Sequence, residues 1–420
     1  MKVLLTGASG FIGRHLAVAL RAAGHRVVET RREAHDASSQ VQVDFTRAIR
    51  VEDWIDKLAG VDCVINAVGI LREHGSQSFE RIHTQAPCAL FKACAQRGVR
   101  RVIQISALGA DRGQSGYFSS KHLADECLAQ LELDWTIVQP SVVYGPGGTS
   151  ARLFSLLASL PITPLPGNGE QQLQPIHIDD LVEAVLAAVA DSNTYRRRVA
   201  LVGPAPLPLK DFLGRLRTSL GFKRAVSFEM PMSLMRVSAS IAQINPRSLL
   251  DRETLEMLEA GNIADPAQTT ALLGRPPRAV ETFIEPRYRT PLAHEALLQW
   301  LIPLMRFSIA AVWIWTGIVS LGLYPIEESY ALLYRVGVSP ALAPLFLYGA
   351  AALDLAFGVA TLALPRRRLL YLLQIALILG YTLIITLKLP EFWLHPYAPI
   401  LKNIPMVVGI YWLYVLEPKK

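Results

Sequence analysis

Up to about residue 145, short apolar runs alternate with stretches that have the periodicity of helices. The runs are apolar at consecutive positions, which is typical of strands buried on both faces of a parallel sheet. The helical stretches would cover those faces, so the pattern predicts an α/β domain with a Rossmann-type, doubly wound parallel sheet. We expect strands at Lys2–Leu5, Arg26–Val28, Val41–Val43, Cys63–Ala67, Arg101–Ile105 and Trp135–Gln139, and helices at Phe11–Ala23, Val51–Ala59, Gln77–Arg97 and Phe118–Leu131.

Residues 146–300 are less regular and contain proline-rich turns. One helix is expected to begin near Asp179 and Asp180, because an aspartate can cap the free N–H groups of a first helical turn. Another is expected over Leu249–Glu259. We interpret this part as a small lid over the carboxyl edge of the sheet, so that residues 1–300 form one nucleotide-binding domain.

Beyond residue 300 the chain changes to four long apolar stretches with few charges. A helix needs about 20 apolar residues to span a bilayer. The second and third stretches reach this length, the first reaches it if Arg306 snorkels to the interface, and the fourth is short. We predict an all-α, four-helix transmembrane domain over residues 301–420. Its stretches are Phe307–Leu323, Ala341–Leu364, Leu369–Leu387 and Ile404–Leu416.

The charges between these stretches predict an orientation. The loop after the first stretch carries Glu327, Glu328 and a single Arg335, whereas the next loop carries Arg366–Arg368. Basic loops stay on the cytoplasmic side of a membrane. The N-terminus also lacks the long apolar region of a signal peptide. We therefore expect a multi-pass protein of the inner (cytoplasmic) membrane, with the nucleotide-binding domain and both termini in the cytosol.

Composition agrees with a membrane protein. Hydrophobic residues make up 51% of the 420 residues, the mean hydropathy is +0.29 and the net charge is +7. We attribute the charge to basic cytoplasmic loops and expect no nucleic-acid partner, because no basic block is interleaved with aromatic residues. The four cysteines form no CxxC pair, so we expect neither a disulfide framework nor a metal site.

Gly7, Gly10 and Gly13 mark a nucleotide-binding turn between the first strand and the first helix. Gly7 permits the tight turn, Gly10 lets the backbone approach a pyrophosphate, and Gly13 lets helix and strand pack closely. The helix N-terminus offers N–H groups and a positive dipole to the phosphates. The predicted cofactor contacts here are Thr6, Gly7, Ser9, Gly10, Phe11, Ile12 and Gly13.

The end of the second strand bears on which cofactor is bound. An acidic residue about 20 positions after the glycines would bind the ribose hydroxyls of NAD(H), whereas an arginine there suits the 2′-phosphate of NADP(H). Arg31 and Arg32 stand at this distance and Glu29 comes too early. NADP(H) is therefore favoured, and NAD(H) stays possible. Further candidate cofactor contacts at the ends of the third and fourth strands are Asp44, Ala67, Val68 and Gly69.

Tyr117 and Lys121 form a Y-x-x-x-K pair, whose spacing puts both side chains on one face of a helix. A phenol has a pKa of about 10 and needs a nearby positive charge to favour its phenolate. Tyr117 would then exchange a proton with a substrate while hydride moves to or from a nicotinamide. Lys121 would also hold the nicotinamide ribose.

These motifs resemble an extended or atypical short-chain dehydrogenase/reductase. The chain is most similar to the branch that contains the NADPH-binding accessory subunit of respiratory complex I and its bacterial relatives. The resemblance covers about residues 1–290, and the four apolar stretches resemble a DoxX-like membrane domain in number and arrangement. It rests on Thr6–Gly13, Asn66–Gly69, Ile105–Asp111, Tyr117–Lys121, Gln139–Pro146, Gln174–Asp180 and Leu250–Asn262.

The resemblance implies further site residues. Pro140, Val142 and Val143 lie in one of the matching motifs and are implied cofactor contacts. The family places a serine or threonine on the substrate oxygen near the end of the fifth strand. That position falls on Ser106 or on Ala107, and we take Ser106 as the third catalytic residue.

Two functions stay open. We favour a membrane-tethered NAD(P)H oxidoreductase that transfers hydride to or from a membrane-associated carbonyl, hydroxyl or quinone substrate. The alternative is a non-catalytic NADPH-binding scaffold, assembly factor or redox sensor of a membrane protein complex, because the complex I relative is thought to use NADPH structurally. The lipid bilayer is a partner in both. Asp354, an ionisable residue within an apolar stretch, is a candidate functional group inside the membrane.

Overall fold

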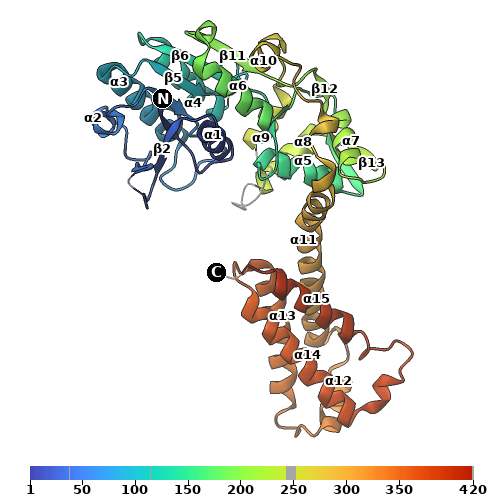
Figure 1. Cartoon of the computed structure of the whole chain (residues 1–420). Coiled ribbons are helices and arrows are strands. Elements are labelled where there is room, and N and C mark those ends of the chain that lie inside the picture. Colours follow the sequence, from blue (N-terminus) through green and yellow to red (C-terminus); the bar gives the residue numbers. More distant parts are fainter. Residues whose placement is uncertain (37, 114, 243–251, 419–420) are drawn as a thin grey trace. The chain divides into compact units, whose positions relative to one another are not determined.

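The chain divides into two compact units, Met1–Ala296 and Leu297–Lys420. The boundary between them falls within one long helix, α11 (Arg289–Ile318). Figure 1 shows both units in a computed structural model. The described residues are 1–36, 38–113, 115–242 and 252–418.

Seven parallel strands form the central sheet of the first unit, in the order β3-β2-β1-β4-β5-β6-β11. Leu4 and Leu5 are neighbours on β1, point to opposite faces and are both fully buried. Burial of both faces explains why the strands are apolar at consecutive positions. The doubly wound parallel sheet is confirmed. Its strands are β1 (Lys2–Thr6), β2 (Arg26–Arg31), β3 (Gln40–Gln42), β4 (Cys63–Asn66), β5 (Arg101–Ile105), β6 (Asp134–Pro140) and β11 (Arg197–Leu201).

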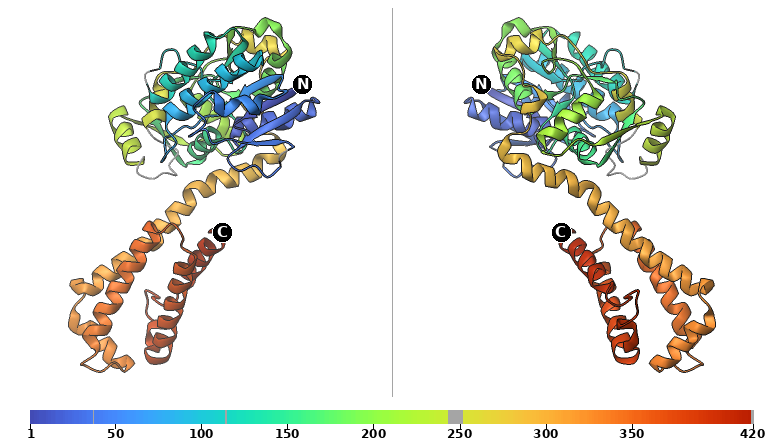
Figure 2. Two further views of the ribbon diagram at one scale, coloured as in Figure 1. Left: turned by 90° about the vertical axis from the view of Figure 1, so that its left-hand side faces the viewer. Right: turned by 90° about the vertical axis from the view of Figure 1, so that its right-hand side faces the viewer.

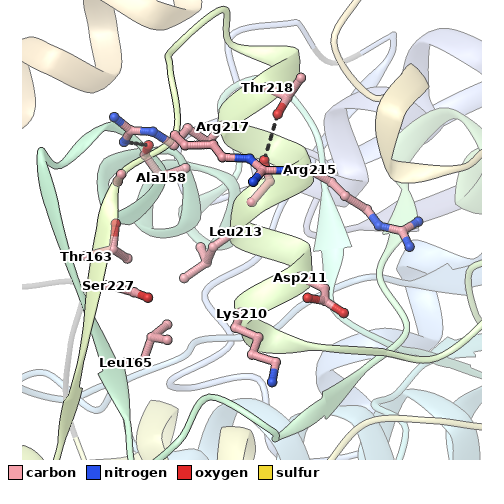
Figure 3. A pocket seen from close by; sticks show the side chains of 13 residues that line it. Ala158, Thr163, Leu165, Lys210, Asp211, Leu213, Arg215, Arg217, Thr218 and Ser227 are labelled. Atoms are coloured by element: carbon pink, nitrogen blue, oxygen red, sulfur yellow. Dashed lines mark hydrogen bonds between the residues drawn. The ribbon is translucent and has the colours of Figure 1, made fainter.

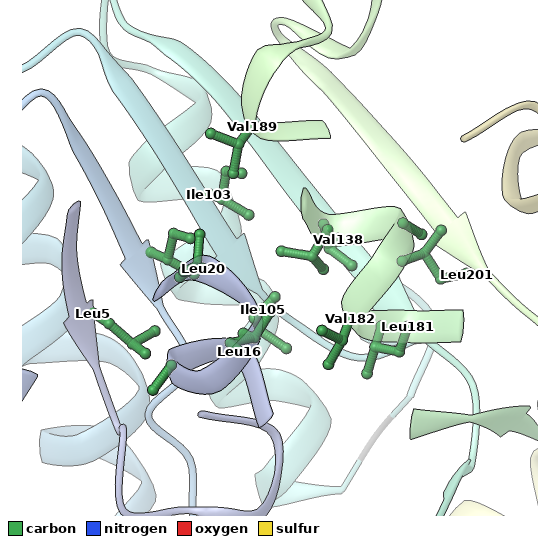
Figure 4. Close-up of a cluster of buried hydrophobic side chains, with 14 of the residues drawn as sticks. Leu5, Leu16, Leu20, Ile103, Ile105, Val138, Leu181, Val182, Val189 and Leu201 are labelled. Atoms are coloured by element: carbon green, nitrogen blue, oxygen red, sulfur yellow. The ribbon is translucent and has the colours of Figure 1, made fainter. Parts of the chain in front are cut away.

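Helices cover both faces of this sheet (Figure 2). On one face, α1 and α6 bury Leu5 and Ile103 in a large apolar cluster, part of which Figure 4 shows. On the other face, α2, α3 and α4 bury Leu4 and Val102. The helices that contribute to these two clusters are α1 (Phe11–Ala22), α2 (Glu52–Ile55), α3 (Ala86–Arg97), α4 (Gly116–Ala129), α6 (Ile178–Ala190) and α10 (Ala267–Leu273).

Two helices expected from the sequence are divided. A π-helical turn at Glu80–Gln85 precedes α3, whose first turn contains Pro87. Proline is tolerated there because the N–H groups of a first turn have no partner within the helix. The helix expected over Val51–Ala59 is α2 followed by a 3₁₀ turn at Asp56–Leu58.

The interpretation of residues 146–300 as a lid alone is wrong. This segment supplies β11, which pairs with β6, and α6, which covers the sheet. His177 caps α6, because its Nδ1 accepts the N–H of Asp179 at 3.3 Å. Asp180, one of the expected capping residues, instead accepts a hydrogen bond of 2.8 Å from Arg275.

A smaller layer of the first unit packs around Phe154 of α5 and Phe212 of α7, whose rings lie 5.0 Å apart. Beside α7, strands β8 and β13 pair in parallel (Figure 3). The helix expected over Leu249–Glu259 corresponds to α9, which begins at Arg252; the first three residues of the expected range lie outside the described residues. The elements of this layer and its neighbourhood are α5 (Thr149–Ser159), α7 (Leu209–Ser219), α8 (Met232–Ala242), α9 (Arg252–Glu259), β7 (Val143–Tyr144), β8 (Ile162–Pro166), β9 (Gln172–Leu173), β10 (Ile176–His177), β12 (Leu207–Pro208) and β13 (Val226–Met230).

The second unit is helical. Among the described residues, three helical segments are long and apolar enough to cross a membrane, namely Pro286–Leu323, α13 (Ala343–Ala363) and α14 (Arg368–Lys388). The fourth expected span is α15 (Asn403–Leu416), which has 14 residues and is shorter than the roughly 17 that a span requires. The loop expected after the first span contains another helix, α12 (Ile326–Val336).

Some charged groups of the second unit are paired with one another. Arg306 Nη2 donates to Glu417 Oε2 at 2.6 Å, and its position at a membrane interface stays a prediction. Arg367 lies 3.6 Å from the other oxygen of Glu417, which is 6% exposed. Asp354 is also 6% exposed, and its Oδ1 has no hydrogen-bond partner among the described residues.

Candidate active site at the carboxyl edge of the sheet

Three neighbouring strands are joined at their carboxyl ends by buried side chains. Thr6 Oγ1 donates to Asn66 Oδ1 at 2.5 Å, and Asn66 Nδ2 donates to Gln104 Oε1 at 2.7 Å. All three residues are at most 1% exposed. Loops that leave these strands therefore start from fixed positions, and they carry the predicted site residues Gly7, Ser9, Gly10, Ala67, Val68, Gly69 and Ser106.

The glycine turn follows β1 directly, and its geometry requires two of its glycines. Gly7 has a φ of +70°, and a Cβ added there would lie 2.6 Å from the carbonyl oxygen of Ala67. A Cβ on Gly13 would lie 2.1 Å from the carbonyl oxygen of Gly7. Neither position can accommodate a side chain. The backbone segments around them therefore approach one another as closely as a dinucleotide-binding turn requires.

The first turn of α1 is open to an anion. Its N-cap is Gly10, which makes no side-chain capping bond. The N–H groups of the first turn have no partner within the helix, and the helix dipole favours negative charge there. The Phe11 ring packs against Gly148, where an added Cβ would lie 2.9 Å from the ring atoms. Ser9 is exposed and Ile12 is half-buried, and their contacts with a cofactor stay predictions.

At the end of β2, an ion-pair cluster forms around Glu29. Arg21 donates to Glu29 Oε1 at 2.6 Å, and Arg31 donates to Oε2 through Nε at 2.9 Å and Nη2 at 2.5 Å. Burial raises the pKa of Glu29, but the two arginines outweigh it and hold this pKa below its usual value. Arg32 is exposed beside this cluster. The carboxylate of Glu29 is thus already paired, and two arginines stand at the strand end.

Asp44 is held on its own loop. Its Oδ1 accepts the backbone N–H and the hydroxyl of Thr46 at 2.9 and 2.8 Å. Burial raises the pKa of Asp44, but these hydrogen bonds and the nearby Arg32 and Arg47 together outweigh it and hold this pKa below its usual value. Its contact with a cofactor stays a prediction.

Tyr117 and Lys121 lie one turn apart on α4, as their spacing predicts. Lys121 is 4% exposed, and its Nζ donates to the carbonyl oxygens of Val68 at 3.3 Å and Ile105 at 3.1 Å. A Cβ on Gly69 would lie 3.2 Å from the same nitrogen. The structure therefore brings the predicted lysine together with the predicted Ala67–Gly69 segment.

Tyr117 lies among aromatic rings. It is 9% exposed, and its ring meets those of Phe79, His83 and Phe118 edge-on, at 6.1, 5.4 and 5.6 Å between centroids. Burial, with a smaller contribution from Asp125, raises the pKa of Tyr117 to about 12. Burial therefore keeps the phenol protonated in this state, and the expectation that a nearby ammonium, together with the nicotinamide ring, favours the phenolate stays a prediction.

Ser106 is committed to a partner that we did not expect. Its Oγ donates to Asp125 Oδ2 at 2.5 Å. Asp125 is 1% exposed, and its Oδ1 has no hydrogen-bond partner among the described residues. Burial raises the pKa of Asp125, whereas burial lowers that of Lys121, one turn earlier on α4. A contact between Ser106 and a substrate stays a prediction, and it requires this hydroxyl to leave Asp125 or to bind both.

His83 fixes the backbone beneath Tyr117. Its Nε2 accepts the N–H of Ile70 at 2.9 Å, and its Nδ1 lies 2.9 Å from Ser120 Oγ. Ser120 Oγ donates its own proton to the carbonyl of Tyr117 at 2.8 Å. Nδ1 must therefore be the donor to Ser120, which defines one neutral tautomer of His83. Burial and the neighbouring Lys121 lower the pKa of His83 to about 2.

The loop after β6 is positioned from a distant part of the chain. Asn262 Oδ1 accepts the N–H of Val142 at 2.9 Å, and Asn262 Nδ2 donates to the carbonyl of Leu108 at 3.2 Å. Pro140 is buried and Val143 is half-buried in the same loop region. The implied cofactor contacts of this loop therefore lie at the same sheet edge, and their role stays a prediction.

Sequence reasoning missed three of these residues. Asp125 follows Lys121 at the same interval of four that joins Tyr117 to Lys121, so helical periodicity contained a signal for it. His83 and Asn262 reach the site from other segments, 37 and 154 residues away from their partners Ser120 and Leu108. Nothing local in the sequence indicates those contacts.

Two families match the chain. Residues 3–203 match the NAD dependent epimerase/dehydratase family, and residues 310–411 match the DoxX-like family. These two regions fall in the first and the second unit.

Curated relatives match the first part of the chain. An epimerase family protein of Mycobacterium bovis is 30% identical over 57% of this chain and 84% of its own length. A ceramide reductase of Caulobacter vibrioides is 28% identical, and the match covers 44% of this chain and 60% of the reductase. NADH dehydrogenase [ubiquinone] 1 alpha subcomplex subunit 9 of Arabidopsis thaliana is 28% identical over 45% of this chain and 50% of its own length.

Solved structures share the fold of the first unit. A nucleoside-diphosphate-sugar epimerase from Staphylococcus aureus has a TM-score of 0.55 and 20% identity, and covers 68% of this chain and 99% of its own. A UDP-glucuronic acid 4-epimerase from Bacillus cereus, solved with UDP-glucuronic acid and NAD, has a TM-score of 0.52 and 19% identity, and covers 70% of this chain and 100% of its own.

The low pKa of His83 predicts an acid-sensitive fold. The unfolded state binds a proton below a pH of about 6.5 while folded His83 stays neutral, so the free energy of unfolding falls by about 1.4 kcal/mol per pH unit below that value. Replacing His83 removes this proton uptake. In His83→Gln the loss of stability between about pH 7 and about pH 5.5 should shrink by up to about 1.4 kcal/mol.

Stability is measured on the full chain in detergent, by urea unfolding read from thiol labelling of buried Cys63 and Cys94. His35→Gln, at an exposed histidine, is the matched control and should keep the pH dependence of the wild type. An unchanged dependence in His83→Gln would contradict the assignment.

Proposed function

This chain belongs to the NAD-dependent epimerase/dehydratase family, and we propose that it is a membrane-tethered oxidoreductase that prefers NADPH. It is an NAD(P)-dependent enzyme of the oxidoreductase type that carries a DoxX-like membrane domain. The proposed reaction is hydride transfer between the nicotinamide and a membrane-associated carbonyl, hydroxyl or quinone substrate.

One observation carries this proposal. The Tyr117–Lys121 pair on α4 and the glycine turn after β1 lie at the same edge of one sheet, and Lys121 bonds the carbonyl of Val68 next to that turn. A bound nicotinamide cofactor would supply the hydride. Lys121 would then hold its ribose, and Tyr117 would hold the proton that the substrate oxygen exchanges.

The state of Tyr117 favours reduction of a carbonyl. A carbonyl oxygen needs a proton when hydride reaches its carbon, and a phenol that burial keeps protonated can donate one. Oxidation of a hydroxyl would instead need the phenolate, which burial disfavours in the described state. We propose carbonyl reduction as the direction of the reaction, because a similar protein is a ceramide reductase.

The preference for NADPH rests on the arginines at the end of β2. A 2′-phosphate needs cationic partners, and Arg31 and Arg32 stand where the ribose of a dinucleotide is held in this fold. Glu29 would compete for NADH, but its carboxylate is occupied by Arg21 and Arg31. The cluster therefore carries more positive than negative charge toward the cofactor.

The membrane domain narrows the class of substrate. A catalytic unit tethered to a bilayer meets lipid-soluble molecules at high local concentration. One similar protein is a ceramide reductase, and a carbonyl on a lipid fits the reductive direction. We propose a membrane lipid carbonyl first and a quinone second.

A second candidate has its own observation. The hydroxyl of Ser106 is bound to Asp125 and not directed at an open site, and a similar plant protein is a subunit of NADH dehydrogenase. A non-catalytic NADPH-binding scaffold or redox sensor of a membrane complex would need the cofactor site but no free serine.

Charge placement supports one orientation. We propose four spans in an inner membrane, with α15 extended at its ends, and with the first unit and both termini in the cytosol. The cluster Arg366–Arg368 then lies on the cytosolic side, as basic loops do.

The role of Tyr117 is tested by Tyr117→Phe. Loss of the phenolic proton should lower kcat by at least about 100-fold while the affinity for NADPH stays within about twofold. Turnover is measured as NADPH oxidation with lipid carbonyls and quinones presented in nanodiscs. Tyr195→Phe is the matched control, since the Tyr195 ring packs under Arg101 and its hydroxyl is outside the site. Tight cofactor retention by the wild type without any turnover would favour the scaffold.

The choice of cofactor is tested by the double variant Arg31→Ala/Arg32→Ala. Losing two cations at the 2′-phosphate should weaken NADPH binding by roughly 10- to 100-fold and change NADH binding by less than about threefold. Fluorescence titration of the reduced nicotinamide measures both. Arg26→Ala, at an exposed arginine of the same strand, should change neither. Equal losses of affinity for NADPH and NADH would show that the two arginines do not bind the 2′-phosphate.

The orientation is tested by thiol labelling of intact cells. Leu394 is 89% exposed in the loop after α14, and Leu394→Cys should react with a membrane-impermeant maleimide from outside. Val18 is 69% exposed on α1, and Val18→Cys should react only after permeabilisation. Labelling of Val18→Cys in intact cells would reverse the proposed orientation.

A further inference from the structure

A cavity of about 490 Å³ lies on the outer side of α7, away from the residues of the cofactor site. Its walls come from α7, from β8 and β13, and from the segment that precedes β13 (Figure 3). The loops that follow β1, β4, β5 and β6 contribute none of its lining residues. The cavity is therefore separate from the glycine turn and from Tyr117.

Four of the lining side chains are cations, and two of them lack a carboxylate partner. Lys210 pairs with Glu170, and Arg215 Nη1 pairs with Glu281 at 2.9 Å. Arg217 donates to backbone carbonyls, among them that of Ala158 at 2.6 Å. Arg224 is exposed and makes no hydrogen bond or ion pair with any described residue.

The guanidinium of Arg217 is fixed in position, but none of the partners that hold it is a carboxylate. Its Nη1 also donates to the carbonyl of Leu160 at 2.7 Å, and its guanidinium lies over the ring of Phe222 at 5.6 Å. Carbonyls and an aromatic face orient the group but leave its charge uncompensated. The single lining carboxylate is Asp211. The carboxylates of Glu170, Glu229 and Glu281 act on Lys210 and Arg215, so the positive charge left for a ligand is that of Arg217 and Arg224.

The remaining walls are hydroxyls and apolar groups. Thr163 and Ser227 are cross-strand neighbours on β8 and β13, and Leu165 and Leu213 line the cavity beside them. Guanidinium groups with nearby hydroxyls suit the oxygens of a phosphate, which arginine binds through paired N–H groups. We propose that this cavity binds a phosphate group of an anionic ligand, at a site distinct from the cofactor site.

A phosphate of this kind can come from a phospholipid headgroup or from a soluble phosphate ester. The opposite face of the β8–β13 ribbon carries Ile162, Val226 and Phe228, which are 56%, 70% and 43% exposed. Ile162 and Val226 face each other across the ribbon. Cationic groups on one face of the ribbon and exposed apolar residues on the other are typical of contact with anionic lipid, so a phospholipid is the favoured source.

The experiment uses the full chain in a phosphate-free maltoside detergent with the cofactor site saturated by NADP(H). One arm titrates sn-glycerol 3-phosphate by calorimetry, and the other counts retained phosphatidylglycerol by native mass spectrometry. Arg224→Gln should weaken binding about ten-fold, the effect of losing one charge-assisted hydrogen bond. Arg26→Gln has the same change of charge at an exposed arginine outside the cavity and should leave binding unchanged.

A second variant tests the cavity without altering its charge. Ser227→Phe would fill the space between α7 and the ribbon and should also abolish binding, while NADP(H) affinity stays that of the wild type. Binding of lipid alone, or of glycerol 3-phosphate alone, identifies the source. No binding of either probe by the wild type at about 10 mM ligand, or equal binding by Arg224→Gln and the wild type, would overturn the proposal.

Discussion

The site depends on a line of hydrogen bonds between buried side chains at the ends of three strands. Thr6, Asn66 and Gln104 bond in series across β1, β4 and β5. An unmade bond there would leave a polar atom without water, at a cost of about 1–3 kcal/mol. The bonds therefore fix the strand ends from which the glycine turn and the Ala67–Gly69 segment leave. Helix α4 is joined to the same strand ends, because Lys121 of α4 donates hydrogen bonds to the carbonyls of Val68 and Ile105.

The chemistry of the site follows from how charge is buried along one face of α4. Lys121 and Asp125 lie one turn apart, and burial moves their pKa values in opposite directions, toward the neutral form of each. Each offsets the burial of the other. The ring of Tyr117, on the same face, packs against aromatic side chains, and burial raises the pKa of its phenol. The phenol therefore stays protonated until a nearby positive charge lowers this pKa.

The second unit indicates where in the cell the protein works. Family membership makes the first unit an NAD(P)-dependent oxidoreductase, and the DoxX-like helices make the chain a membrane protein. Some of their charged groups pair with one another, as Arg306 does with Glu417, whereas Asp354 Oδ1 has no hydrogen-bond partner among the described residues. An enzyme tethered in this way is suited to substrates that stay in the membrane, and a cationic cavity on α7 adds a place for a lipid phosphate.

The sequence by itself determined the parallel sheet, the glycine turn, the Tyr117–Lys121 pair and three apolar spans, because each is written in local periodicity or spacing. It gave no strand over Arg197–Leu201, a part of the segment interpreted as a lid that supplies the seventh strand of the sheet, since apolar pattern reports burial but not the neighbour that causes it. The tertiary structure alone decided that Ser106 bonds Asp125, that Glu29 is paired with Arg31, and that Asn262 holds the loop after β6. Ser106 and Asp125 are 19 residues apart in sequence, and Asn262 and Val142 are 120 apart, so only the folded chain brings them within hydrogen-bond distance. Glu29 and Arg31 are two positions apart on β2, but the sequence does not show which partner the carboxylate takes.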